Sequence, residues 1–262
     1  MIHGINNEYL YAVTKVVILV SNGKNCISSQ GTGFWISRGE DCFLITNRHV
    51  IEPGWKDSKY SPYTRIVSIS FDCRHYEDVN KDVRCVSYTM SNYSLVFSPN
   101  GIDDIACIYD VRVNDFKDKL TLIPFSMLAT SEQYEKELSV CDHVAFIGFP
   151  VVYDHKHNMP ILRSGYISSD PRLDYSPDEK DYGHIVAYEA FSTEGASGSP
   201  AFATQKGFRT GKGINAPVGF YRPPLLIGIN AGSYTVSNTH QHMSYMFKSD
   251  QIIDLITLAK PV

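Results

Sequence analysis

Short apolar runs separated by turn residues recur through most of this sequence. Their lengths and their β-branched and aromatic content favour strands over helices, so we predict an all-β body. The predicted strands are Leu10–Val20, Thr32–Ile36, Cys42–Thr46, Arg65–Phe71, Ser94–Phe97, Ile105–Tyr109, His143–Phe149, Pro160–Ile167, Ile185–Phe191, Pro200–Phe202, Leu225–Ile229 and Met243–Lys248.

A polar stretch, residues 129–137, separates two sets of these runs and predicts a surface turn of helix or a linker. We therefore divide the chain into a first β-unit over residues 1–120, a connection over 121–138 and a second β-unit over 139–262. Residues 249–258 carry apolar side chains at helical spacing, with Ser249 as candidate N-cap, and predict a C-terminal helix that Pro261 would stop. Loops are expected at 170–183 and 204–224.

Composition and charge place the chain among globular proteins. It has 262 residues, of which 43% are hydrophobic and 20% charged, far from disordered or collagen-like values. The net charge of -4 is spread along the chain, without the basic stripe that neutralises phosphates, so we expect no nucleic-acid partner. No apolar run reaches the length of a membrane span, so no membrane partner is expected either.

The N-terminus and the cysteines bear on location. Residues 1–8 lack the charged start and apolar stretch of a signal peptide, which predicts a cytoplasmic protein, or a secreted one if a leader was removed. The six cysteines show no CxxC pair and no framework spacing, so we expect mostly reduced, buried, small hydrophobic residues. They are Cys26, Cys42, Cys73, Cys85, Cys107 and Cys141.

Residues 195–200 read GASGSP, a tight turn in which glycines bracket Ser197 directly before an apolar run. Glycine adopts backbone conformations that other residues resist, so such a turn can aim successive N–H groups at one point. The N–H groups of Gly195 and Ser197 would then stabilise the oxyanion that forms when a serine hydroxyl attacks a carbonyl. An ordinary Gly-Ser loop is the alternative.

Two further segments supply the partners that such a serine needs. Residues 44–50, LITNRHV, form an apolar run that ends in a polar turn and presents His49, a base for the serine proton. Asp104 stands at the entrance to the apolar run 105–108, where a carboxylate can orient the imidazole and stabilise its charged form. Taken alone, a histidine after a strand is more often structural, and an aspartate such as Asp104 is more often a turn residue. Asp103 is the alternative to Asp104 as the carboxylate that orients His49.

The chain order His, Asp, Ser and the segments around these residues resemble the trypsin-like peptidases, and more the HtrA-type and bacterial branches than the digestive enzymes. The resemblance extends in order from about Thr14 to Ile256. The matching segments are 31–35 (GTGFW), 44–50 (LITNRHV), 104–106 (DIA), 148–150 (GFP), 195–200 (GASGSP) and 226–229 (LIGI).

This resemblance implies two packed six-stranded antiparallel β-barrels, with His49 and Asp104 in the first and Ser197 in the second. It implies a serine endopeptidase that binds an extended protein or peptide substrate by strand addition. The same resemblance implies that substrate contacts Phe191, Ser192, Thr193, Asn230, Ala231 and Gly232. Residues 243–245 would form the wall of the specificity pocket opposite the first three. No fixed carboxylate marks the specificity pocket, so we expect an uncharged P1 side chain.

The sequence departs from the family pattern in its activation signals. It has no cleavable Ile-Val-Gly-Gly start, and Ala196 stands where the digestive enzymes have an aspartate that serves this mechanism. We expect no PDZ-like domain after the predicted helix. We therefore expect an enzyme that is constitutively assembled or controlled by a regulatory protein partner.

Two alternatives come from other functional classes. A peptide-binding module could keep the fold without turnover. A zinc site could use the pairs His155 with His157 and His240 with His242, but neither pair has the carboxylate or cysteine spacing of a zinc enzyme, so we expect solvated histidines, no metal and no cofactor. A cysteine nucleophile is disfavoured because no cysteine lies in a glycine-bracketed turn.

Overall fold

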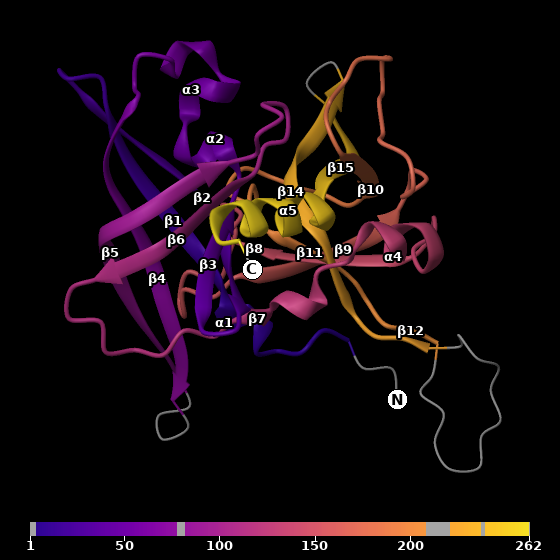
Figure 1. Cartoon of the computed structure of the whole chain (residues 1–262), viewed down its shortest axis with the longest axis horizontal. Coiled ribbons are helices and arrows are strands. Elements are labelled where there is room, and N and C mark those ends of the chain that lie inside the picture. The colour runs from indigo at the N-terminus through magenta and orange to yellow at the C-terminus, as the bar shows by residue number, and fades with distance from the viewer. Residues whose placement is uncertain (1–3, 78–81, 208–220, 237–238, 262) are drawn as a thin grey trace.

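The computed structural model describes residues 4–77, 82–207, 221–236 and 239–261, without the side chains of residues 235–242. Two β-barrels lie side by side, the first from indigo to magenta in Figure 1 and the second from orange to yellow. The all-β double barrel with a C-terminal helix confirms the predicted fold class.

The first barrel is formed by six antiparallel strands in the order β1-β4-β5-β6-β3-β2, and pairing of β1 with β2 closes it. Along β1 the side chains of Val16, Ile18 and Val20 are buried and those between them are partly exposed, as expected for one face turned to the core. The strands are β1 Val13–Ser21, β2 Cys26–Arg38, β3 Asp41–Thr46, β4 Arg65–Glu77, β5 Asp82–Phe97 and β6 Ala106–Val113, and β7 Ile123–Pro124 pairs in parallel with β2.

The second barrel closes in the order β10-β15-β14-β11-β8-β9. Its strands are β8 His143–Gly148, β9 Ile161–Ile167, β10 Ile185–Glu189, β11 Pro200–Ala203, β14 Leu225–Val236 and β15 Thr239–Lys248. A small two-stranded sheet, β12 Lys206–Gly207 with β13 Tyr221–Arg222, lies within the segment predicted to be a loop. Residues 208–220 of that segment lie outside the described residues.

The helices are short except for the last one. They are α1 Tyr9–Ala12, α2 Arg48–Ile51, α3 Pro53–Lys56, α4 Ser131–Lys136 and α5 Ser249–Ala259, with single 3-10 turns η1 Ser58–Tyr60 and η2 Phe125–Met127. Helix α4 forms in the predicted polar stretch because Thr130 and Gln133 make a reciprocal capping box. The prediction of Ser249 as an N-cap is wrong, since it is the first helical residue and its hydroxyl donates to the carbonyl of Ala129 at 2.7 Å.

Helix α5 contacts both barrels. Its side chains Ile252, Leu255 and Ile256 are buried in one core together with Phe43 of the first barrel. At the end of the helix, Lys260 makes ion pairs with Asp41 at 2.6 Å and Asp110 at 2.7 Å, both in the first barrel. The chain therefore returns from the second barrel and joins it to the first.

All twelve predicted strands are present, but their lengths differ from the prediction. Strand β5 begins at Asp82 rather than Ser94, because its first half extends a two-stranded ribbon with β4 and shows no apolar run. Residues 10–12 are helical rather than extended. The first half of β5 thus forms by partly exposed backbone pairing rather than by burial of an apolar run.

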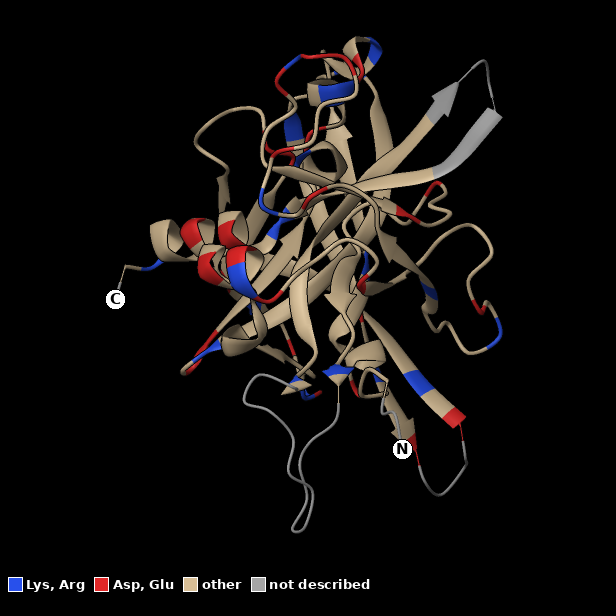
Figure 2. Cartoon of the chain, turned by 90° about the vertical axis from the view of Figure 1, so that its right-hand side faces the viewer, with Lys and Arg blue, Asp and Glu red and all other residues tan. Residues whose placement is uncertain are grey.

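The cysteines are free, as expected, but most are not buried. Only Cys73 and Cys107 are buried, whereas Cys26, at the start of β2, and Cys141, in a turn, are exposed. No helix formed by the described residues is long and apolar enough to cross a bilayer. Figure 2 shows Lys and Arg residues scattered among Asp and Glu residues rather than gathered on the face in view.

Candidate active site

Strand pairing in the first barrel brings His49 and Asp104 together. The end of β3 pairs with the start of β6, with Thr46 opposite Ala106. The residues that leave β3 and those that enter β6 are therefore neighbours, and His49 in α2 follows the first while Asp104 precedes the second. The local sequence order thus becomes a spatial contact only through this pairing.

Two hydrogen bonds align the carboxylate with the imidazole. The Asp104 Oδ2 atom lies 2.5 Å from His49 Nδ1, and its Oδ1 accepts the backbone N–H of His49 at 2.9 Å. The amide of Asn47 donates to the backbone carbonyl of Asp104 at 2.6 Å and fixes the main chain as well. The Asp104 side chain is 3% exposed and that of His49 is 20% exposed, so the other edge of the ring remains accessible.

The charge of Asp104 is stabilised although the residue is buried. Burial by itself would raise the pKa of the Asp104 carboxyl, but the charge and hydrogen bond of His49, together with the charge of Lys56, hold this pKa below its ordinary value. An ionised carboxylate against Nδ1 favours the tautomer that leaves Nε2 free to accept a proton.

Lys56, at the end of α3, spans the space between the barrels. Its ammonium lies 3.8 Å from Asp104 Oδ2 and donates to the carbonyl of Ala231 and to the Tyr245 hydroxyl, each at 3.2 Å. It therefore links the Asp104 carboxylate to strands β14 and β15 of the second barrel. No sequence signal indicated this role.

The Ser197 turn is anchored to both barrels by its backbone. The Ser197 carbonyl accepts the N–H of Thr32 on β2 at 2.8 Å, and the Gly198 N–H donates to the Asn230 carbonyl on β14 at 2.9 Å. Gly198 has a φ of +88°, and a Cβ there would lie 1.9 Å from the Thr32 carbonyl oxygen. Only glycine fits at position 198.

The glycine ahead of the serine is also held, and two amides remain available. The Thr32 hydroxyl donates to the Gly195 carbonyl at 2.8 Å and accepts the Phe149 N–H at 3.0 Å. Ala196 uses its own N–H in a turn to Thr193. No acceptor among the described residues takes the N–H of Gly195 or of Ser197, so these two amides can bind an anionic oxygen.

Gly31 on β2 is where the histidine and serine segments meet. A Cβ on Gly31 would lie 2.6 Å from Cγ2 of Val50, the residue after His49, and 3.1 Å from the carbonyl oxygen of Ser197. The absence of a side chain thus allows both segments to approach β2 at one point. Ser197 is half-buried at this junction.

Asn230, predicted to bind substrate, has its side chain inside the second barrel. Its amide donates to the Ser192 hydroxyl at 3.0 Å and the Ala196 carbonyl at 2.8 Å, and its side-chain oxygen accepts from Tyr188 at 2.6 Å. Because all three contacts are buried, this side chain stabilises the loop around the nucleophile candidate. This supporting role was not predicted.

The other predicted substrate contacts lie along β14 and the loop before the Ser197 turn. Phe191 is 39% exposed, and Ser192 is buried. The Thr193 hydroxyl is buried without a partner among the described residues. Ala231 falls at an irregularity in the pairing of β14 with β15 and is buried, and Gly232 is half-buried against the Tyr245 ring.

Asp103 makes a second carboxylate–imidazole pair, with His184 at the start of β10. Its Oδ1 accepts the His184 backbone N–H at 2.9 Å, and its Oδ2 lies 2.9 Å from the His184 Nδ1. Asn100 donates to the same carboxylate at 2.6 Å. The two neighbouring aspartates therefore bind histidines of different barrels.

Of the two histidine pairs considered for zinc, His155 and His157 bind different partners. His157 Nδ1 lies 2.8 Å from Asp154 Oδ2, whereas His155 Nε2 lies 2.9 Å from the carbonyl of Val151. The side chains of His240 and His242 lie outside the described residues.

A comparison with models of protein families identifies the family of this chain. A family model described as a trypsin-like peptidase domain matches residues 31–208. An HtrA-type protease solved with a tripeptide is similar in structure, with a TM-score of 0.57 and 17% identity over 97% of this chain and 62% of that chain. This chain therefore spans less than two thirds of that one.

Two further solved structures resemble the chain over their full or nearly full length. Deg5 has a TM-score of 0.56 and 16% identity, over 97% of this chain and 91% of that one. The protease Anisep from Arthrobacter nicotinovorans has a TM-score of 0.59 and 13% identity, over 99% of this chain and 100% of that one. A search of curated proteins found no match. At these identities the structural likeness concerns the fold.

Proposed function

Because this chain belongs to the family of trypsin-like peptidase domains, we propose that it is a serine protease that cleaves peptide bonds through an acyl-enzyme formed on Ser197. His49 accepts the proton of the serine hydroxyl and then donates it to the leaving amine. Asp104 orients His49 and stabilises its charged form. Water then attacks the acyl-enzyme by the same route, with His49 acting again as base.

The observation that carries this proposal is the two-point contact between Asp104 and His49. The 2.5 Å contact at Nδ1 and the 2.9 Å bond from the backbone N–H set the ring orientation before substrate binds. Such preorganisation lowers the reorganisation required in the transition state. The remaining exposure of His49 leaves its Nε2 edge available to a serine.

The proposed oxyanion hole consists of the N–H groups of Gly195 and Ser197. Both lack an acceptor among the described residues, while the Ala196 N–H between them is already bonded to Thr193. The Thr32 hydroxyl holds the Gly195 carbonyl and so fixes the peptide group between Gly195 and Ala196, which lies between the two proposed donors. One donor of this kind contributes about 10²- to 10³-fold to turnover in acyl transfer.

The proposed substrate is an extended protein or peptide segment that pairs with β14. The backbone of Asn230 already bonds the serine loop through Gly198 and Ser199. Strand addition is therefore proposed along Ala231 and Gly232, with Phe191 at the exposed edge of the P1 pocket. A tripeptide accompanies the HtrA-type protease of similar fold, which supports a peptide as the ligand class.

A fluorophosphonate probe tests the activated serine directly. We expect the full chain to gain the mass of one probe, and Ser197→Ala and His49→Ala to gain none, because acylation requires both nucleophile and base. Ser199→Ala is the matched control, since Ser199 lies two residues away and its buried hydroxyl has no partner among the described residues. It should label like the wild type.

The alternative functions give different outcomes in the same experiment. Folded wild-type protein that stays unlabelled would contradict autonomous catalysis and favour a silent peptide-binding module or an enzyme that needs a regulatory partner. Labelling that persists in Ser197→Ala would place the reactive nucleophile elsewhere.

A further inference from the structure

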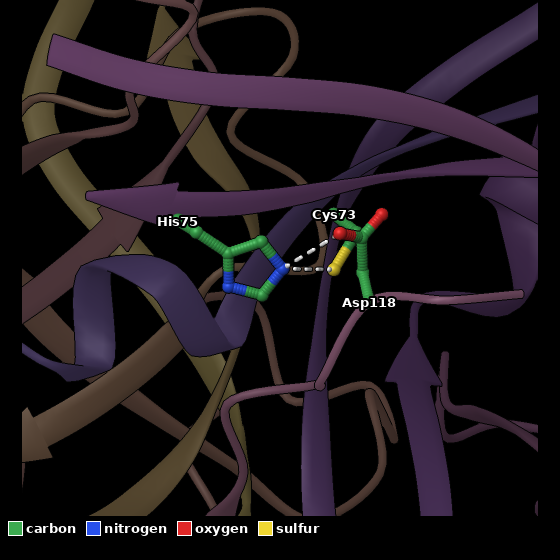
Figure 3. A group of neighbouring side chains, drawn as sticks. All are labelled: Cys73, His75 and Asp118. Atoms are coloured by element: carbon green, nitrogen blue, oxygen red, sulfur yellow. Dashed lines mark hydrogen bonds and ion pairs between the residues drawn. The ribbon is translucent and has the colours of Figure 1, made fainter. Parts of the chain in front are cut away.

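Cys73, His75 and Asp118 bring a sulfur, a nitrogen and an oxygen ligand together outside the proposed active site. Cys73 and His75 stand two residues apart on β4 and so share one face of the strand. Asp118 belongs to the segment between β6 and β7, which crosses that face. The three ligand atoms lie within 4.8 Å of one another, and Figure 3 shows the Nε2 edge of His75 facing both partners.

Two of the three separations match those of ligands around one tetrahedral ion, and all three ligand atoms lie within 4.8 Å of one another. Zinc binds sulfur at about 2.3 Å and nitrogen or oxygen at about 2.0 to 2.2 Å, which places tetrahedral ligand atoms about 3.4 to 3.6 Å apart. The Cys73 Sγ lies 3.4 Å from the His75 Nε2, and this Nε2 lies 3.5 Å from the Asp118 Oδ1. A metal ion can therefore bind between them with small side-chain adjustments.

We propose that Cys73, His75 and Asp118 form a binding site for one divalent transition-metal ion, with zinc as the ion that best suits this ligand set. Thiolate, imidazole and carboxylate together favour zinc over magnesium or calcium, which prefer oxygen ligands alone. A thiolate and a carboxylate also balance the charge of a dication. The site is independent of the proposed peptidase reaction.

Neighbouring side chains hold the carboxylate from outside, as is common around protein-bound metals. The Tyr88 hydroxyl donates to the second oxygen of Asp118. The Arg84 guanidinium lies 3.3 Å from the Oδ1 of Asp118, but its side chain is 52% exposed. It can turn towards solvent when the ion takes this oxygen, which removes the repulsion between the two cations.

A cavity beside the site provides room for a fourth ligand. It measures about 410 Å³ and is lined by His75 and residues 119–122. Water entering from this side can complete a tetrahedral shell. The carbonyl of Lys119, 3.9 Å from the Cys73 sulfur, is a second candidate on the same wall.

The ion would join the segment between β6 and β7 to the wall of the first barrel. Asp118 is the ligand from this segment, and the other two ligands belong to β4. Binding must also release the thiol proton, because a metal ion takes cysteine as the thiolate.

Titration of the full chain with Co²⁺, a spectroscopic substitute for zinc, tests the site. We expect one equivalent to bind with a thiolate-to-cobalt absorption band, and Cys73→Ser to lose this band. Asp118→Asn should weaken binding at least tenfold, as expected for a lost ligand. Cys85→Ser is the matched control, because Cys85 lies on the neighbouring strand, where its sulfur accepts from Asn158 at 2.8 Å, and it should bind like the wild type.

The wild-type titration decides the proposal even if a variant fails to fold. A folded wild-type chain without a thiolate band would overturn it, and so would a band that survives in folded Cys73→Ser. Zn²⁺ should also displace Co²⁺ and raise the midpoint of thermal unfolding of the wild type and of Cys85→Ser. Loss of peptidase labelling with an intact cobalt band would instead refute only the proposed function.

Discussion

Asp103 and Asp104 are adjacent in the chain and equally buried, and each binds the backbone N–H and the Nδ1 atom of one histidine. Asp104 binds His49 within the first barrel, beside the Ser197 turn. Asp103 binds His184 across the boundary, at the start of a strand in the second barrel. The same local chemistry therefore serves two purposes, and only position distinguishes them.

The difference lies in what the free edge of each histidine faces. His49 is 20% exposed at the junction where Val50 and the Ser197 carbonyl meet Gly31, whereas the His184 side chain is 41% exposed on the outside. A carboxylate–imidazole pair is thus not by itself a sign of catalysis. It becomes one only when a nucleophile and an oxyanion site stand beside it.

The largest expected effect separates the two aspartates by activity. Asp104→Asn should lower kcat about 10⁴-fold, because it favours the wrong tautomer of His49, whereas Asp103→Asn should stay within about tenfold of the wild type. Peptidase kinetics on purified, folded variants measure both. If activity is lost only in Asp103→Asn, the proposed role of Asp104 is wrong.

The second effect distinguishes Asp103 from Asp104 by its contribution to the free energy of unfolding. Asp103→Ala should lower the free energy of unfolding by about 1 to 3 kcal/mol, because the buried Asp103 carboxylate loses its hydrogen bonds from Asn100 and from the backbone and ring of His184. Urea unfolding measures this. Asp178→Ala, which removes an exposed ion pair with Lys180, is the control and should stay within about 0.5 kcal/mol of the wild type.

The third effect is a pH dependence of stability that arises from the His184 pair. Partial burial by itself would lower the pKa of His184, but the hydrogen bond and charge of Asp103 raise it above its ordinary value of 6.5, with smaller contributions from Asp174 and Asp250. A raised folded-state pKa stabilises the fold fully below the unfolded value, and this stabilisation is lost as pH rises through the folded value.

Unfolding midpoints in urea across pH test this sign. The stability difference between wild type and His184→Gln should be larger at about pH 5 than at about pH 8. An equal difference at both pH values, or a larger one at the higher pH, would show that the pair does not gain from charging His184.

The smallest effect concerns Lys56. Its side chain is 45% exposed, and an exposed ion pair of this kind contributes up to about 1 kcal/mol, so Lys56→Met should change kcat/KM less than about fivefold. Lys59→Met, which removes an exposed pair with Asp57 in the same region, should have no effect. A loss above about 100-fold would mean that Lys56, rather than the backbone bond to His49, is what positions Asp104.

Much of the candidate site was accessible from the sequence because it sits in short segments with distinctive residues. Glycine-bracketed Ser197 and the histidine turn after an apolar run are local signals. Positions 195 and 198 require glycine because the carbonyl oxygens of Phe149 and Thr32 approach them closely. The strands were also predictable, since burial of one face leaves an apolar run. The unpredicted half of β5 is partly exposed and leaves no such signal.

The sequence by itself determined the all-β class, the order of the chemical groups and the positions that must be glycine. It favoured Asp104 only through the family resemblance and kept Asp103 as the alternative, because both stand at the same strand entrance. Only the tertiary structure assigned them to His49 and His184, and only it brought Lys56 to Ala231 and Asp118 to Cys73. These contacts join residues between 45 and 175 positions apart, and pattern along a chain carries no information on which distant side chains a closed barrel will bring together.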